Sequence, residues 1–315
     1  MKLAVTGASG FVGSAVVRRA LAQGHAVRAL VRGTGHRLPP NAETIETGDL
    51  LRAPLTGGEL DGCDALINCA ARVHVTRETA SDPDAAYRAM NSDLPVRLLR
   101  IAARSGVKRF VQMSSVAAVT SRTPPGTIVD DRFDPAPQTP YGRSKLEADR
   151  RLAEEGALLA VPVVSIRPPT IFGPGVGAYF RMLMRCAKLG LPLPIGGIAN
   201  SRSFMFLGNL ADATLCAAAA DVSGSFIVTD SAPLSTADLY RALLRLYRRP
   251  AIVPRLPGGF VHGVASLFLG ERVESLLGDS AFDGARFAAL SQWTPPTDFS
   301  RALTLTVEKV DEALV

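Results

Sequence analysis

The first 21 residues, MKLAVTGASGFVGSAVVRRAL, contain the feature that most limits what this chain can fold into. A short apolar run leads into three glycines, Gly7, Gly10 and Gly13, and an apolar helical pattern follows them. Glycine has no Cβ, so it permits an unusual backbone turn and lets the backbone approach an anion closely. The free N–H groups at the start of the next helix favour negative charge. The stretch therefore predicts a strand, a tight turn and a helix that together bind the pyrophosphate of a dinucleotide.

The length and composition are those of a globular enzyme, with 315 residues, 47% hydrophobic and 20% charged. The formal net charge is +6, but Lys and Arg are spread along the sequence, so we expect no nucleic-acid binding. Four cysteines without metal-site spacing and an N-terminal apolar run too short for a signal peptide predict a cytoplasmic protein with reduced thiols and no bound metal. We also expect no transmembrane segment, since the most apolar later run, Phe260–Leu269, is too short and is expected to pack as a helix.

Apolar runs alternate with helical patterns along the first half of the chain. This alternation predicts an α/β fold built on a doubly wound parallel Rossmann sheet. Strands after the first are expected at residues 26–31, 44–46, 65–69, 109–113 and 161–166. Between them we expect a helix over 83–105 that is interrupted at Pro95, and a helix over 141–155.

A segment rich in proline and glycine, RPPTIFGPG at Arg167–Gly175, follows the last of these strands. Such a composition stops regular structure, so we expect the chain to turn here toward a second domain. We predict a dinucleotide-binding domain over residues 1–167, joined by a returning strand near 225–230. Residues 168–315 are predicted to form a smaller α+β substrate-binding lobe.

The end of the second strand indicates which dinucleotide binds, because it meets the adenosine ribose in this type of sheet. An acidic residue there hydrogen-bonds a 2′-hydroxyl and favours NAD, but this chain has Val31 followed by Arg32. Arginine pairs well with a 2′-phosphate, and Arg28, His36 and Arg37 are close enough in sequence to add positive charge. The sequence therefore favours NADP(H), with NAD(H) left open.

Other cofactor contacts are expected from the turns after the remaining strands. Asp49 follows the third strand and is placed to meet the adenine edge, while the small residues after the fourth strand let a cofactor pass closely. The further residues assigned to the cofactor are Ser9, Phe11, Val12, Leu50, Ala70, Ala71 and Pro168.

Three residues have the side chains needed for proton transfer at a sugar or alcohol oxygen. Tyr141 and Lys145 lie four apart, which on a helix places both on one face. A neighbouring ammonium favours the phenolate, so we expect Lys145 to lower the pKa of Tyr141 and let it act as an acid and base near neutral pH. Ser115, at the end of the fifth strand, is expected to hydrogen-bond the same oxygen.

Together these motifs resemble the extended short-chain dehydrogenase/reductase superfamily, in its NAD-dependent epimerase/dehydratase branch that acts on nucleotide sugars. The resemblance covers essentially the full chain. Its motifs are TGASGFVG at residues 6–13, NCAA at 68–71, Ser114-Ser115, YGRSK at 141–145 and RPPTIFGPG at 167–175. The resemblance implies that Tyr141 is the acid/base, that Ser115 steadies the reacting oxygen, and that Lys145 holds the nicotinamide ribose.

The resemblance also implies a UDP-sugar substrate. It places Arg202 on the substrate diphosphate, with Arg272 as a second candidate. His74, in the polar loop expected beyond the end of the fourth strand, is also assigned to the substrate site, with Ser115 and Thr170. A homodimer is compatible with it. Details such as RVHV, LGLPLPIGG and WTPP are similar to bacterial 4-ketoreductases of UDP-N-acetylated deoxysugars used for surface polysaccharides.

Two departures argue against a simple UDP-glucose 4-epimerase: the acidic residue is absent at Val31-Arg32, and an expected asparagine is replaced within Pro168-Pro169-Thr170. An epimerase retains its oxidised cofactor, whereas a reductase exchanges it, which suits a site selective for the phosphorylated cofactor. We therefore expect NAD(P)-dependent 4-keto-sugar reduction. The 4-epimerase, a reductase of small aromatic or steroid ketones, and a redox-sensing protein without turnover are the alternatives.

Overall fold

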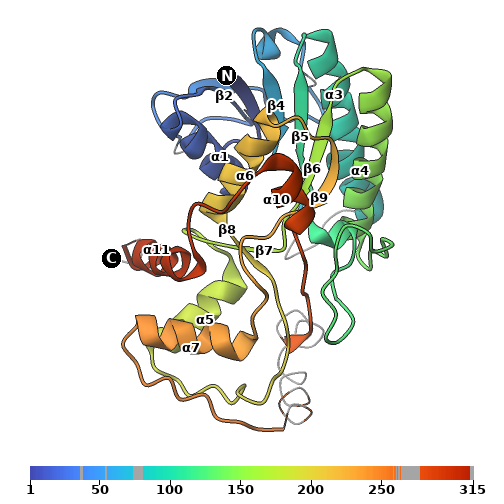
Figure 1. Ribbon diagram of the computed structural model, residues 1–315. Helices are drawn as coiled ribbons and strands as arrows, with labels where there is room; N and C mark the ends of the chain where they lie inside the picture. The colour runs from blue at the N-terminus through green and yellow to red at the C-terminus, as the bar shows by residue number, and fades with distance from the viewer. Residues whose placement is uncertain are drawn as a thin grey trace.

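The computed structural model describes residues 1–35, 38–53, 55–73, 81–257 and 277–312, together with residues 259, 261 and 263. Within these residues a seven-stranded parallel sheet has the strand order β3-β2-β1-β4-β5-β6-β9 (Figure 1). The predicted α/β fold with a doubly wound Rossmann sheet is thereby confirmed. The strand bounds are β1 (Lys2–Thr6), β2 (Ala26–Val31), β3 (Glu43–Glu46), β4 (Ala65–Asn68), β5 (Arg109–Met113), β6 (Val163–Arg167) and β9 (Gly224–Ile227).

Helices cover both faces of this sheet. On one face α1 (Phe11–Ala22) packs beside α6 (Leu207–Ala219), and on the other α3 (Leu94–Arg104) packs beside α4 (Pro140–Leu158) (Figure 1). Successive strand residues therefore enter different cores: Val111 of β5 lies in the first and Phe110 in the second, and both are fully buried. Burying an apolar side chain of this size stabilises the fold by about 1.5–3 kcal/mol, which explains why these strands read as continuous apolar runs.

The order of the strands predicts where a ligand binds. The chain moves outward from β1 to β2 and β3, then returns to the other side of β1 and continues through β4, β5 and β6. In an open parallel sheet the crevice at such a reversal, at the carboxyl ends of the strands, is the ligand site. Here it lies between the ends of β1 and β4, where the glycine turn begins.

The remainder of the chain forms a smaller lobe around a two-stranded sheet of β7 (Thr170–Phe172) and β8 (Phe204–Phe206). The prediction that RPPTIFGPG lacks regular structure is wrong for these three residues, because pairing with β8 imposes a strand that local composition does not favour. Phe172 stacks on Phe180 at 5.3 Å in an aromatic core. The lobe helices are α5 (Ala178–Lys188), α7 (Thr236–Leu246) and α11 (Phe299–Glu312), while α10 (Ala285–Ser291) packs against β9.

The predicted interrupted helix over 83–105 consists of α2 (Pro83–Arg88), a π-helical turn at Ala89–Asp93, and α3. The interruption precedes Pro95 instead of falling at it, since proline is well tolerated in the first turn of α3. Asn91, fully buried in the π-helical turn, bonds the backbone N (2.8 Å) and O (2.9 Å) of Arg72 and the Ser144 hydroxyl (3.0 Å). The side-chain amide of Asn91 thus joins Arg72, which follows β4, to Ser144 in helix α4.

Within the part of the chain that the structure describes, no helix is long and apolar enough to cross a bilayer. Most of the Phe260–Leu269 run, predicted to be a helix, lies outside the described residues. The same is true of His36, Arg37, His74 and Arg272.

Candidate active site

The predicted strand, turn and helix at the N-terminus are present, and two of the glycines are required by close packing. Gly7 has φ +62°, and a Cβ built on it would lie 2.7 Å from the Ala70 nitrogen. A Cβ on Gly13 would lie 2.2 Å from the Gly7 carbonyl oxygen. The turn therefore lies directly against the chain after β4 and leaves no space for side chains.

The first turn of α1 is open to an anion. Gly10 is the N-cap residue and supplies no side-chain hydrogen bond, and the first turn carries no acidic residue. Ser9, Gly10 and Phe11 are exposed, and Val12 is half-buried. Unpartnered N–H groups at a helix start, beside a turn without side chains, fit the pyrophosphate of a dinucleotide.

A buried chain of polar side chains runs beneath this turn, across the ends of three adjacent strands. The Thr6 hydroxyl donates to Asn68 (2.5 Å), whose amide donates to Gln112 (2.8 Å). All three side chains are fully buried. The Asn68 oxygen also accepts from the Ala70 nitrogen at 3.2 Å, which fixes the small residues at the end of β4 against the glycine turn.

Ser115 and Tyr141, 26 residues apart in the sequence, are hydrogen-bonded to each other. Ser115 follows β5 and begins a short 3-10 turn, where its hydroxyl accepts from the Ala117 nitrogen at 3.2 Å. Tyr141 lies in the first turn of α4, which Thr139 caps. A Cβ on Gly142 would lie 2.3 Å from the Ala117 carbonyl oxygen, so glycine here lets α4 lie directly on the Ser115 turn.

Lys145 completes the predicted set from the next turn of α4. Its side chain is 1% exposed, its Nζ donates to the Met113 carbonyl (2.7 Å), and it lies 5.8 Å from the centre of the Tyr141 ring. Burial lowers the pKa of Lys145 to about 8, with the charge of Asp149 opposing the shift.

The expectation that Lys145 lowers the pKa of Tyr141 is wrong for this structure. Burial raises the pKa of Tyr141 to about 12, and the hydrogen bond with Ser115 only partly offsets it. The physical reason is that the phenol is buried and the charge of Asp149 also raises its pKa, while the Lys145 ammonium points to the Met113 carbonyl. At neutral pH the phenol therefore holds its proton.

Sequence reasoning missed a buried ion pair directly behind these residues. Asp149 accepts from the Ser114 hydroxyl (2.9 Å) and from Arg167 Nε (2.8 Å), and its side chain is 1% exposed. It stands one helical turn beyond Lys145 on the same face of α4. The signal was available, because Tyr141, Lys145 and Asp149 repeat every four residues.

The low pKa of Lys145 predicts a pH dependence. We expect kcat/KM to fall above about pH 8, because loss of the ammonium removes positive charge beside the reacting oxygen. The folded pKa lies below the ordinary 10.5, so burial of the charge costs stability below about pH 8, and this cost fades as the pH rises further. A rate profile that stays flat from about pH 7 to pH 10 would contradict the assignment.

The expected cofactor contacts follow the carboxyl ends of the parallel strands. Arg32 is exposed immediately after β2. Asp49 is half-buried, with one carboxylate oxygen accepting from the Leu51 nitrogen at 3.0 Å, while Leu50 is buried. Pro168 follows β6, and its carbonyl accepts from the Val116 nitrogen at 3.1 Å, beside Ser115. Ala70 and Ala71 follow β4 against the glycine turn.

Arg28 does not add charge to the cofactor site as expected. Its guanidinium pairs with Glu43 at 2.9 Å and donates to the Glu59 carbonyl at 2.9 Å. Arg28 thus holds β3 and a neighbouring turn to β2. It is 9% exposed, so its role is structural.

Of the residues predicted to bind the substrate, the structure describes Ser115, Thr170 and Arg202. Thr170 is half-buried in β7, and Arg202 is 5% exposed, with its Nη1 donating to the Gly278 carbonyl at 2.7 Å. Gly278 and Asn200 line a cavity of about 540 Å³, together with Arg122, Thr123, Pro125, Gly197, Ile198, Ala199, Gly259, Leu277 and Asp279. This cavity is large enough for part of a nucleotide.

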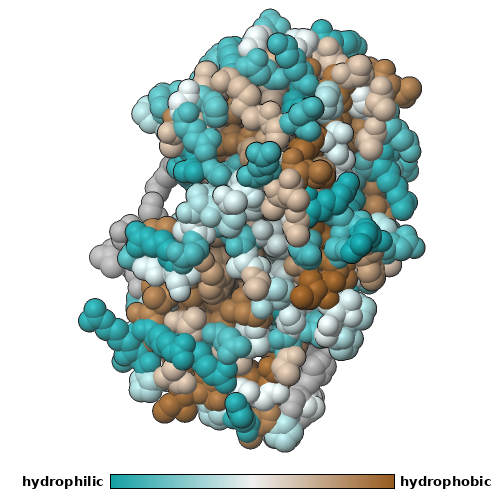
Figure 2. All heavy atoms as spheres, in the orientation of Figure 1, coloured by the Kyte–Doolittle hydropathy of each residue, from teal (hydrophilic) through white to brown (hydrophobic). Residues whose placement is uncertain are grey.

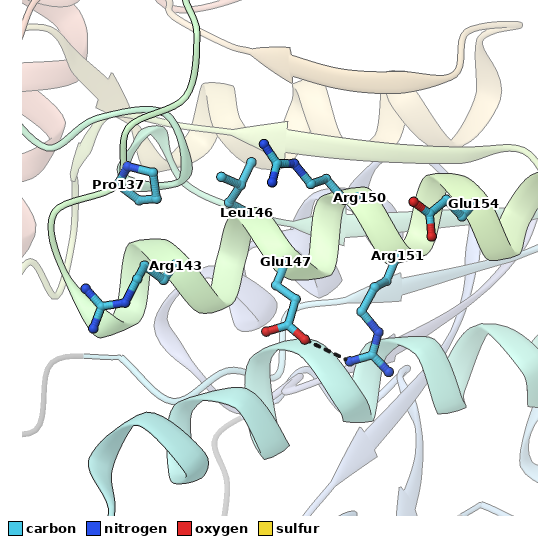
Figure 3. A pocket seen from close by; sticks show the side chains of 7 residues that line it. All are labelled: Pro137, Arg143, Leu146, Glu147, Arg150, Arg151 and Glu154. Carbon is cyan, nitrogen blue, oxygen red and sulfur yellow. Dashed lines mark hydrogen bonds and ion pairs between the residues drawn. The ribbon is translucent and has the colours of Figure 1, made fainter.

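A second cavity of about 500 Å³ lies on the outer side of α4 (Figure 3). Its walls are long charged side chains such as Arg143, Glu147 and Arg151, the last two paired at 3.4 Å. Tyr141 and Lys145 do not line it, so it is separate from the proposed chemistry. Among the described residues, no group of three His, Cys, Asp or Glu side chains is arranged to hold a metal ion.

Comparison with known proteins agrees with this geometry. The family model described as "NAD dependent epimerase/dehydratase family" matches residues 3–228. A UDP-glucose 4-epimerase from Vibrio cholerae is 30% identical over 309 residues, covering 96% of this chain and 94% of that protein. A UDP-N-acetylglucosamine 4-epimerase from Methanobrevibacter ruminantium M1, solved with UDP-N-acetylmuramic acid, has a TM-score of 0.80 at 20% identity, covering 99% and 98% of the two chains. MoeE5 in complex with UDP-glucose and NAD has a TM-score of 0.75 at 21% identity and full coverage of both chains.

Proposed function

Because the chain belongs to the NAD-dependent epimerase/dehydratase family, we propose that it transfers hydride at C4 of a UDP-linked sugar, and in particular that it reduces a 4-keto-sugar. The observation that supports this is the Ser115–Tyr141 hydrogen bond at the carboxyl end of the sheet, with Lys145 one helical turn away. The glycine turn and the open end of α1 supply the dinucleotide site beside it.

A bound dihydronicotinamide would supply the hydride that becomes the new C4–H bond. Tyr141 Oη would give its proton to O4, and the Ser115 hydroxyl would hold that oxygen while its charge develops. Lys145 would hold the nicotinamide ribose and place positive charge near Tyr141. A phenol with a pKa of about 12 is protonated at neutral pH, which is the form that reduction requires.

We assign NADPH as the preferred cofactor on account of Arg32. Arg32→Asp should raise the Kd of NADPH about tenfold to a hundredfold, the cost of losing a charge-assisted hydrogen bond to the 2′-phosphate. The Kd of NADH should not rise, because the new carboxylate can accept a hydrogen bond from the 2′-hydroxyl. Both constants can be measured by nicotinamide fluorescence. Arg104→Asp, on the exposed side of α3, is the matched control and should alter neither. Equal effects on the two cofactors would remove Arg32 from the 2′-phosphate site.

UDP-hexose 4-epimerisation is the second candidate, favoured by the Vibrio cholerae relative. Incubation with a UDP-4-keto-sugar and NADPH separates the two. A reductase consumes one NADPH for each sugar reduced, whereas an epimerase interconverts two UDP-hexoses with no net change in nicotinamide absorbance. NADPH-independent interconversion at a comparable rate would replace our proposal with the epimerase.

Thermal unfolding with UDP tests the substrate class. A ligand at a hundred times its Kd stabilises a protein by about 2.7 kcal/mol, so UDP at millimolar concentration should raise the Tm measurably. No shift would favour the reductase of small aromatic or steroid ketones. Binding of dinucleotide without turnover of any substrate would favour the redox-sensing protein.

A place in the synthesis of surface polysaccharide sugars is also part of the proposal. It follows if the product of the reaction is a UDP-N-acetylated deoxysugar.

We also propose a homodimer. The outer face of α4 alternates in charge through Arg143, Glu147, Arg150 and Glu154, so a second copy related by a two-fold axis can present opposite charges to it (Figure 3). Light scattering should give twice the 33.3 kDa chain mass. A single-chain mass at micromolar concentration would contradict this.

A further inference from the structure

The substrate lobe ends in an exposed surface that the proposed reaction does not use. It is formed by residues 185–191, at the end of α5, and residues 245–256, at the end of α7. We name it the lobe-tip surface. It lies at the end of the molecule opposite the sheet, along the lower edge of Figure 1.

Hydrogen bonds hold the two segments side by side. Arg249 Nε donates to the Lys188 carbonyl at 3.0 Å, and the buried Tyr240 donates its hydroxyl to the Leu191 carbonyl at 2.6 Å. Slightly farther along, the Gly196 nitrogen donates to the Pro254 carbonyl at 2.9 Å. The surface is therefore a fixed part of the lobe.

Aliphatic side chains project from this surface into solvent. Leu189 is 71% exposed and Ile252 is 62% exposed, and Leu191, Leu246 and Leu256 are between 37% and 42% exposed. Figure 2 shows brown apolar atoms next to teal hydrophilic atoms along the same lower edge. Isolated exposed leucines are ordinary, but several on two adjacent segments indicate a binding surface.

The charge on these segments has one sign. Residues 185–191 and 245–256 contain six arginines and lysines and no aspartate or glutamate, whereas the whole chain carries a net charge of +6. The formal charges of the rest of the chain therefore cancel. Arg185, Arg245, Arg248 and Arg255 are exposed and form no ion pair with a described residue. Basic residues that are spread along the sequence are thus gathered by the fold.

We propose that the lobe-tip surface docks on an anionic lipid bilayer. Basic side chains are attracted to the negative headgroups, while Leu189, Leu191 and Ile252 enter the boundary between headgroups and acyl chains. Charge complementarity selects an anionic surface, and the exposed aliphatic side chains select lipid over nucleic acid, which is bound through phosphate contacts and aromatic stacking. The lobe-tip surface presents aliphatic and not aromatic side chains at residues 189, 191 and 252.

Co-sedimentation of the full chain with large unilamellar vesicles tests the proposal. Vesicles of phosphatidylcholine with about 30% phosphatidylglycerol should bind the protein at low salt, and pure phosphatidylcholine vesicles should not. Raising the salt to about 0.5 M should release most of it. Equal binding to both kinds of vesicle, or no binding to either, would overturn the proposal.

Matched variants localise the contact. Arg245→Gln/Arg248→Gln should lower partitioning into anionic vesicles about tenfold or more, whereas Arg18→Gln/Arg104→Gln, which removes the same charge on α1 and α3, should have little effect. Leu189→Ser/Ile252→Ser should also weaken vesicle binding without any change in charge. All these positions are exposed, and an unchanged Tm verifies that each variant is folded. If the serine variant binds vesicles as well as the parent, or if duplex DNA binds the parent and vesicles do not, the lipid assignment is wrong.

Discussion

Tyr141→Phe is expected to lower kcat about a thousandfold, because general acid–base catalysis by a positioned side chain contributes about 10² to 10⁴ in rate. The phenol is the group hydrogen-bonded to Ser115 at the carboxyl end of the sheet. Phenylalanine keeps the ring and its packing against Tyr87 while removing the transferable proton. Dinucleotide affinity should therefore stay within about twofold of the parent's.

Tyr87→Phe is the matched control for this experiment. Tyr87 lies against Tyr141 and is 8% exposed, and its hydroxyl donates to the Val73 carbonyl at 3.5 Å. Loss of that hydroxyl should change kcat little. Steady-state kinetics with an accepted substrate measures both variants. If Tyr141→Phe retains the parent's turnover, or if Tyr87→Phe loses as much, the proton comes from another group.

Asp149→Ala is expected to lower the free energy of unfolding by about 3–5 kcal/mol, because it leaves a buried guanidinium without its partner. Arg167 is 7% exposed and Ser114 is 3% exposed, so water does not replace the lost carboxylate easily. Equilibrium unfolding in urea measures the loss. Glu155→Ala removes a carboxylate from the same helix, but its pair with Arg100 lies at the surface and its loss should change stability far less.

A milder variant separates stability from catalysis. Asp149→Asn keeps the size of the side chain but removes the charge that opposes the lowered pKa of Lys145. The alkaline limb of the kcat/KM profile should therefore move below about pH 8. An unchanged limb would limit Asp149 to a structural role.

The parts of the site that could be predicted are those fixed by local sequence. Gly7 and Gly13 lie between a strand and a helix, and Tyr141 and Lys145 share a helix face. The spacing of these residues along the sequence was therefore sufficient to predict the glycine turn and the Tyr–Lys pair. Their long-range partners could not be predicted in this way. Gln112 meets Asn68 because parallel pairing aligns the ends of β4 and β5, and Arg167 meets Asp149 because α4 packs against β6.

Two expectations were wrong because tertiary structure overrode local composition. Thr170–Phe172 forms a strand in a segment rich in proline and glycine, since β8 supplies its partner. Arg28, judged by its nearness to Arg32 in sequence, lies inside a strand and pairs with Glu43. The lobe-tip surface could not be predicted for a related reason: its basic residues come from two chain segments that only the folded lobe brings together.

Asn91 sets a practical limit on remodelling this enzyme. Its amide bonds both backbone groups of Arg72 and the Ser144 hydroxyl. These bonds hold the chain after β4 against helix α4. A designer who grafts a new loop after residue 73 to change substrate preference can keep Arg72, Asn91 and Ser144 as attachment points. Grafts that keep these three residues should leave Tyr141 in place. A graft that replaces Arg72 with proline would remove the N–H that donates to Asn91 and would weaken the attachment of α4.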